Sequence, residues 1–176
     1  MPPIEQITDG FLSYARDRLA DNLAQIERCV GLLTVEQIWH RPNEVSNAIG
    51  NLVLHLSGNV RQWIMAGLDG QPDARDRPSE FARRDTIPTA EILNRLRETV
   101  QQAVHVISQL TAEELTQPIK IQGYEVTGLQ GVFHVTEHFS LHTGQIVYAT
   151  KVILNCDLNL YDADGNRLDG HNVGVP

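Results

Sequence analysis

Apolar residues recur at steps of three and four along most of this chain, and that spacing is typical of amphipathic helices packed around a shared core. The pattern predicts four long helices, over residues 4–33, 47–68, 90–110 and 128–154. Residues suited to N-terminal capping precede the last three of these helices and two single turns, namely Ser46, Thr89, Thr127, Thr34 and Thr111. The predicted fold class is therefore all-α, a four-helix bundle.

Two connections in this bundle are long. Residues 69–88 are rich in proline, glycine and charge, so they are predicted to form a loop. Residues 118–126 alternate apolar and polar side chains around a glycine, which predicts a small hairpin. A second small hairpin or an extended tail is expected near the C-terminus, so the chain divides into a bundle of residues 1–154 and an extension of residues 155–176.

Composition changes this picture mainly by what it excludes. The chain has 176 residues, of which 41% are hydrophobic and 20% charged, as is ordinary for a soluble globular protein. Its 22 acidic and 14 basic residues give a net charge of −8, so neither nucleic acid nor an anionic membrane is expected as a partner. Four arginines alternate with acidic residues and predict a solvated, self-neutralising loop, and they are Arg75, Arg77, Arg83 and Arg84.

Neither membrane insertion nor export is expected from the sequence. No apolar run approaches the roughly 18–20 residues of a membrane span. The first residues carry neither the basic flank nor the apolar segment of a signal peptide. Two cysteines, Cys29 and Cys156, are too few for a disulfide framework. We therefore expect a cytoplasmic protein with reduced thiols.

Histidines provide the candidate chemistry of this sequence. His134, His138 and His142 recur at every fourth residue of the fourth helix, which stacks them on one helix face. His55 lies in the inward stripe of the second helix. Imidazoles in a dry core lose free energy unless their nitrogens are bonded, and a divalent metal ion satisfies them because neutral imidazole is a good metal ligand. Two ligands from one helix and a third from another leave coordination positions open, as catalytic metal sites do.

Spacing alone leaves the pair on the fourth helix open. At about 100° per residue, His134 lies about 80° around the helix from His142, so all three rings cannot point equally well at one ion. We choose His138 and His142 as the ligands, although the spacing leaves this choice nearly even. His134 is then a supporting or structural residue.

Residues 47–56 and 137–146 together resemble the DinB-like superfamily (DinB/YfiT type), a damage-inducible family of four-helix proteins. The similarity spans roughly residues 4–154, and its most specific part is the His-x-x-x-His-x-Gly-Gln-Ile ending. The resemblance implies an up-down-down-up bundle that is often a homodimer. It also implies one divalent metal ion per chain, with zinc or nickel before iron or manganese, on a triad that falls on His55, His138 and His142. Thr143 departs from the family pattern, because many members carry arginine there.

The resemblance also suggests a reaction, since related members transfer a low-molecular-weight thiol to an electrophile. A thiol S-transferase acting on a small molecule is our first expectation, and a metal-dependent hydrolase is the second. Hydrolysis normally needs a general base, and Glu137 points about 100° away from His138, which favours the transferase. A third reading is a non-catalytic metal-binding protein of the stress response. The sequence leaves open whether the protein is an enzyme at all.

Overall fold

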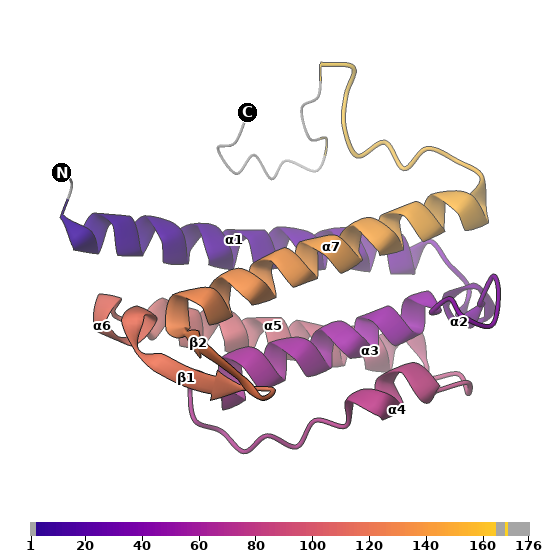
Figure 1. Ribbon diagram of the computed structural model, residues 1–176. Helices are drawn as coiled ribbons and strands as arrows, with labels where there is room; N and C mark the ends of the chain where they lie inside the picture. Colours follow the sequence, from indigo (N-terminus) through magenta and orange to yellow (C-terminus); the bar gives the residue numbers. More distant parts are fainter. Residues whose placement is uncertain (1–2, 165–167, 169–176) are drawn as a thin grey trace.

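Four long helical segments lie side by side and form the body of the computed structural model, which describes residues 3–164 and residue 168 (Figure 1). They are α1 (Ile4–Gly31), α3 (Ile49–Val60) with its continuation η1 (Arg61–Ala66), α5 (Thr89–Gln109) and α7 (Gly128–Leu154). α1 and α7 run in one direction, and α3 and α5 run in the other (Figure 1). This is the predicted up-down-down-up bundle.

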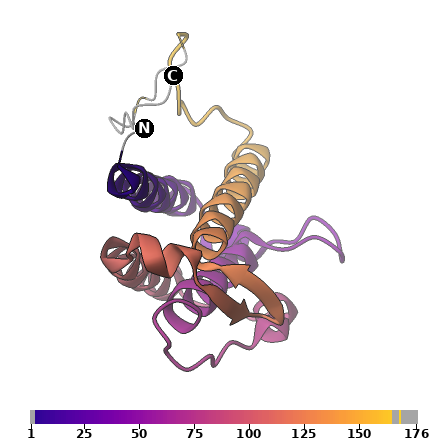
Figure 2. The same cartoon turned by 60° about the vertical axis from the view of Figure 1, so that its left-hand side comes forward.

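Short elements connect the long helices. They are α2 (Val35–Trp39), α4 (Arg77–Ala82), α6 (Ala112–Thr116), β1 (Pro118–Ile121) and β2 (Tyr124–Thr127). β1 and β2 form the predicted antiparallel hairpin, in which Ile121 pairs with Tyr124 across a two-residue turn. Both turn residues, Gln122 and Gly123, have positive φ angles, as a tight hairpin turn of this kind requires. In Figure 2 this hairpin lies at one end of the bundle, beside the first turns of α7.

The core follows the predicted apolar stripes. Side chains from all four long segments meet in it with no exposed surface, among them Leu19, Ile26, Ile64, Leu96 and Phe139. Each such side chain contributes about 1.5–3 kcal/mol through burial, so the stripes rather than the loops fix the packing of the bundle. None of the described helices combines the length and the apolar character that a bilayer span needs.

The second helix differs from its prediction in two respects. It begins at Ile49 with Ala48 as its N-terminal capping residue, so the predicted cap Ser46 lies before the helix and does not cap it. Its last part, η1, is a π-helix, a widened form that often occurs at functional sites. The other long helices end within two residues of their predicted limits, and the capping boxes at Thr34 and Thr111 are confirmed.

The prediction for residues 69–88 was wrong in part. The segment contains α4, and the side chains of Arg75 and Glu80 are 4% and 8% exposed, not solvated. Near the C-terminus, the Leu168 N–H donates to the Leu160 carbonyl at 3.1 Å, as the predicted hairpin would require. Its turn residues 165–167 and the tail from residue 169 lie outside the described residues. The division of the chain at residue 154 stays a prediction.

Candidate metal centre

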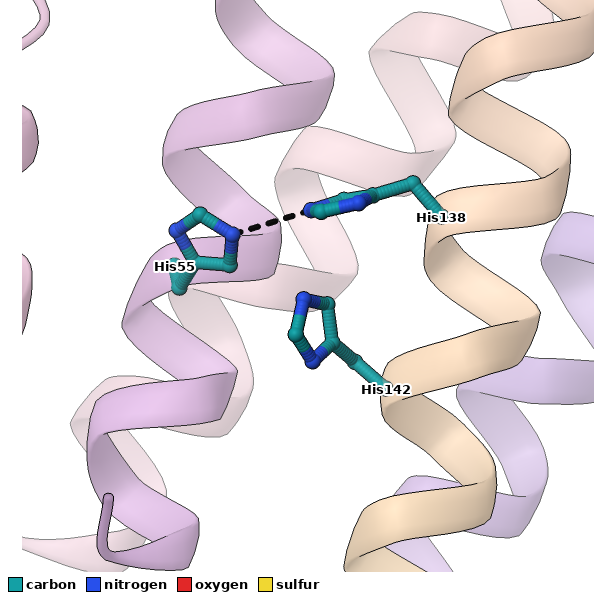
Figure 3. Close-up of side chains that lie close together, drawn as sticks. All are labelled: His55, His138 and His142. Carbon is teal, nitrogen blue, oxygen red and sulfur yellow. Dashed lines mark hydrogen bonds between the residues drawn. The ribbon is translucent and has the colours of Figure 1, made fainter. Parts of the chain in front are cut away.

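Three imidazole rings from two helices meet between α3 and α7 (Figure 3). His55 extends from α3, while His138 and His142 extend from successive turns of α7. His55 Nε2 lies 2.9 Å from His138 Nε2, and one ring nitrogen from each of the three side chains lies within 4.8 Å of the others. The ring centre of His142 is 5.0 Å from that of His55 and 4.5 Å from that of His138. These three histidines can therefore hold a metal ion.

The helices impose this meeting. Every residue of α3 is buried, and only 3% of the His55 surface is exposed. On α7 the two histidines are four residues apart, which puts them one turn above each other on the side that faces α3. The predicted set is thus brought together as the family resemblance implies.

A carboxylate holds the far side of the His55 ring. Glu80 Oε2 lies 2.9 Å from His55 Nδ1, and because a carboxylate only accepts, the ring nitrogen donates. The Nε2 lone pair of His55 is then left facing His138. Arg75 donates to both oxygens of Glu80, from Nε at 2.8 Å and from Nη2 at 2.9 Å. This is the carboxylate–histidine arrangement that orients metal ligands in many proteins.

The backbone around Glu80 is fixed to α3 as well. Asn51, which has no exposed surface, donates to the Glu80 carbonyl at 2.8 Å and accepts from Arg41 at 2.8 Å. Gly58 provides the space for the carboxylate, since a Cβ atom at this position would collide with Glu80 Oε1. The segment that was predicted as a solvated loop is therefore packed onto the helix that carries His55.

His142 is oriented by a weaker partner. Its Nδ1 donates to the amide oxygen of Gln145 at 2.7 Å, which leaves Nε2 as the free acceptor of the ring. Thr143, which stands where related proteins often carry arginine, is buried and donates to the Phe139 carbonyl at 2.8 Å. Thr143 is thus a core residue of α7 and adds nothing to the metal centre.

Burial keeps the histidines of α7 neutral at neutral pH. Desolvation, and then the nearby rings of His142 and His55, lower the pKa of His138 to about 3. Desolvation also lowers the pKa of His142, although its hydrogen bond to Gln145 opposes this. Burial raises the pKa of Glu80, but hydrogen bonds from Arg75 and His55 outweigh it, so the pKa is lowered and the group is a carboxylate. Neutral imidazoles beside a carboxylate are the protonation states that metal binding needs.

His134 lies outside the group, as its predicted supporting role requires. Its ring stacks on Trp63 with 4.0 Å between ring centres, and it lies nearly parallel to the His138 ring at 5.3 Å. Desolvation lowers its pKa too. His134 therefore packs between Trp63 of η1 and His138, and it limits the orientations open to His138.

The donor set fits zinc or a divalent transition metal. All three donors are imidazole nitrogens, which suit zinc, nickel, copper and iron, whereas magnesium and calcium prefer oxygen. Two Nε2 atoms that face each other at 2.9 Å repel unless a proton or a cation lies between them. At neutral pH one proton on His138 Nε2 meets this need, and a metal ion can replace it.

Sequence reasoning missed Glu80 and Arg75. The charges around them alternate in sign, which is also the pattern of a solvated loop. One signal was available, because Phe81 follows Glu80 directly and its ring lies 4.6 Å from that of His55. An aromatic residue within a charged segment favours a docked segment over a solvated one.

Fold and site together define a DinB-like four-helix bundle with three histidines between its second and fourth long helices. Residues 6–162 match the family described as "Protein of unknown function (DUF1572)", and the chain belongs to this family. No curated protein matches the chain.

Solved structures share the fold. A conserved protein from Enterococcus faecalis has a TM-score of 0.63 at 19% identity, and the match covers 89% of this chain and 100% of that one. A DinB-like protein of Bacillus subtilis, YjoA, has a TM-score of 0.62 at 19% identity, covering 85% of this chain and 94% of that one. At this identity the likeness shows the fold.

Proposed function

We propose that this protein binds one divalent metal ion on His55, His138 and His142 and transfers a low-molecular-weight thiol to a small electrophile. The observation that carries the proposal is the convergence of three imidazole nitrogens within 4.8 Å, beside an open cleft. A bound divalent ion stabilises the anionic form of a thiol and so supplies a sulfur nucleophile at neutral pH. Zinc or nickel is the metal we expect first, with iron or manganese after them.

In this reaction the residues of the chain hold and orient the imidazole rings of the metal site. Glu80 fixes the tautomer of His55, and Gln145 fixes that of His142, so both rings present Nε2 to the same point. The thiolate sulfur attacks the electrophilic carbon and forms a carbon–sulfur bond. The leaving group departs with the electron pair of the broken bond, and the thiol proton passes to solvent. No oxidant or reductant is needed.

The position of Glu80 favours this transfer over hydrolysis. A hydrolase needs a general base that can reach a water molecule. The carboxylate in contact with the triad is that of Glu80, which is hydrogen-bonded to His55. Both of its oxygens are already engaged, by His55 and by Arg75. Glu137, the sequence neighbour of His138, is exposed. Thiol transfer needs neither carboxylate as a base, because the thiol ionises when it is bound.

The metal is tested by elemental analysis of the purified full-length chain. We expect about one divalent ion per chain, and loss of nearly all of it in His138→Ala. The matched control is His105→Ala, which removes an exposed histidine of α5 and should keep the metal. Metal-free wild-type protein, or equal metal in both variants, would overturn the proposal.

The transfer is tested with the Co²⁺-substituted protein. Cysteine, glutathione and 2-mercaptoethanol should each change the visible spectrum if sulfur enters the open coordination positions. Monochlorobimane then serves as a small electrophile, and its thiol adduct should form faster with the wild type than with His138→Ala. If metal is present but neither the spectrum nor the rate responds, the protein is a metal-binding protein without transferase activity.

We propose further that the protein is a homodimer through the outer side of α7. Five large apolar side chains on this helix are 45–72% exposed, and they are Leu129, Phe133, Leu141, Tyr148 and Val152. At about 100° per residue they fall on one side of the helix. The exposed Glu137 and Lys151 lie on the same side, so the surface is mixed, and large apolar side chains grouped on one face in this way are typical of interaction surfaces. Sedimentation at micromolar concentration should give twice the chain mass, and Phe133→Glu with Tyr148→Glu should give the monomer.

A further inference from the structure

A cleft of about 630 Å³ opens beside the three histidines, between η1, β2 and α7. Its lining includes His55 and His138 together with Asn59, Trp63, Arg77 and Gln130. His55, Asn59 and Trp63 are spaced four residues apart along α3 and η1, so they lie on neighbouring turns of one helical face. The cleft thus continues from the candidate metal centre along a polar wall.

Two polar groups on this wall lack hydrogen-bond partners. The Oδ1 atom of Asn59 and the Nε1 atom of Trp63 are buried and unpaired in the described part of the chain, and the two residues are 3% and 4% exposed. A third buried atom without a regular hydrogen bond, Glu27 Oε1, lies 2.7 Å from Arg97 Nη2 and is paired by charge. Unpaired polar atoms therefore concentrate at the cleft.

An unpaired buried group costs folding free energy, about 1–3 kcal/mol each. Two such groups on one wall are retained against that cost, although leucine or phenylalanine would fill the same space without it. A molecule that enters the cleft and bonds to them would offset that cost. An ordered water molecule is one such partner, and a ligand is the other.

The charges around the cleft select the kind of ligand. The chain has a net charge of −8, yet no aspartate or glutamate is found among the described residues that line the cleft. Arg75 is neutralised by Glu80, whereas Arg77 has no ion pair within the described ranges and only lies over the Phe81 ring at 5.1 Å. An anion is therefore favoured here.

The hydrogen-bonding groups select the form of that anion. The indole Nε1–H and the guanidinium group can only donate, and a half-turn of the Asn59 amide brings its NH₂ group to the position of its oxygen. A ligand group that accepts from two or three donors at once fits this wall. A carboxylate has two acceptor oxygens and the matching charge.

We infer that this cleft binds the carboxylate group of a small organic acid, which accepts hydrogen bonds from Trp63 Nε1 and the Asn59 amide and has Arg77 as its counter-charge. The inference deepens the proposed function. It rests on that function in one respect, namely that the other end of the acid reaches the metal centre. The thiol of the proposed transfer is then a thiol that carries a carboxylate.

The two tryptophans of the chain allow a direct test. In a ¹⁵N-labelled sample Trp63 and Trp39 give separate indole N–H signals, which Trp63→Phe assigns. Trp39 donates to the Ile87 carbonyl at 3.1 Å and serves as the internal control. Zinc-treated and metal-free protein are each titrated with propionate, 3-mercaptopropionate and the neutral 3-mercaptopropionamide. We expect both carboxylates to shift the Trp63 signal to saturation, the amide to bind at least tenfold more weakly, and the Trp39 signal to stay in place.

Three variants locate the carboxylate. Trp63→Phe keeps an aromatic ring against His134 and should weaken 3-mercaptopropionate binding about tenfold, as should Asn59→Leu. Arg77→Gln changes an exposed residue and should leave the fold intact. This variant should weaken 3-mercaptopropionate binding three- to tenfold and reduce the salt dependence of that binding. The unfolding temperature of Asn59→Leu should stay unchanged or rise, because an unpaired polar group is removed.

The following results would overturn the inference of a carboxylate site. Equal shifts with the acid and the amide exclude a carboxylate site, and a Trp63 signal that no probe moves excludes a ligand at this wall. A lower unfolding temperature of Asn59→Leu with unchanged affinity shows a structural water instead. Propionate has no thiol and is tested with and without zinc, so failure of the carboxylate site is distinguished from failure of the metal or the thiol proposal.

Discussion

His55 and His142 are oriented by the same kind of contact at two different strengths. Each ring donates from Nδ1 to a side-chain oxygen, which leaves Nε2 for the other histidines. For His55 the acceptor is a buried carboxylate that Arg75 holds in turn. For His142 the acceptor is the neutral amide of Gln145, one turn away on the same helix in an exposed contact.

The difference assigns unequal roles to the two helices of the centre. The α3 side is fixed by a network that reaches through Glu80 and Asn51, with charged and buried hydrogen bonds. On the α7 side His138 has no hydrogen bond at Nδ1 among the described residues, and His142 has one that water can replace. We therefore expect α3 to set the position of the ion, while the α7 rings adjust to it.

The largest effect is expected on folding, from Glu80→Ala. This variant leaves the Arg75 guanidinium buried without its carboxylate, and breaking a buried pair in this way costs about 3–5 kcal/mol. We expect about 3 kcal/mol, because a cleft of about 310 Å³ next to Arg75 admits water. Urea unfolding of the metal-free protein measures the change, with the exposed Glu98→Ala as control. A loss below about 1 kcal/mol would mean that the pair is not structural.

The next effect is on metal affinity, from Glu80→Gln. The amide keeps the shape of the side chain and can still accept from His55, but the charge that favours the Nε2 lone pair is lost. Removing a carboxylate of this kind typically weakens metal binding about 10–100-fold. Competition with a chelating dye measures this for Zn²⁺, and Glu98→Gln should bind as the wild type does. Equal affinities would show that Glu80 serves the fold alone.

A third effect is the dependence of stability on pH. Since burial and the neighbouring rings lower the pKa of His138 from 6.5 to about 3, the folded protein binds this proton more weakly than the unfolded chain does. In the metal-free protein, the contribution of neutral His138 to the free energy of unfolding is therefore fully present above pH 6.5. It is lost as the pH drops toward 3. His134 and His142 act in the same direction, because burial lowers their pKa values as well. The Glu80 carboxylate adds to the loss only below its ordinary pKa of 4.5.

The size of this pH effect is bounded. One proton gives at most about 1.4 kcal/mol per pH unit, and partial exposure of His138 reduces this to about half. Between pH 6.5 and 5 the contribution of His138 should lower the melting temperature by roughly 1.5–3 °C per pH unit. Thermal unfolding in matched buffers measures this change. In His138→Gln the melting temperature should depend less steeply on pH, because the contribution of one histidine is missing. A flat or rising melting temperature on acidification contradicts neutral, buried rings.

The asymmetry also separates what the sequence predicts from what it cannot. The α7 side is local, since the spacing of His138 and His142 and the position of Gln145 three residues later lie within one periodic segment. The α3 side depends on residues 25 positions apart, and the charged segment around Glu80 has the same composition whether it is solvated or docked. Docking is decided by Asn51 and Gly58, which a helical pattern treats as ordinary positions. The π-helical turn at Trp63 is likewise not marked by the apolar spacing, which continues through it.

The smallest effect is expected from Gln145→Ala, and it tests the weak side directly. The hydrogen bond from His142 is neutral and exposed, so its net contribution is about 0.5–1 kcal/mol. Water takes the place of the amide oxygen, and Zn²⁺ affinity should fall about two- to fivefold with no change in the unfolding temperature. The same dye competition measures it, with Gln101→Ala on α5 as control. A loss as large as that of Glu80→Gln would show that α7 fixes the ion as firmly as α3 does, because equal costs mean that neither ring adjusts.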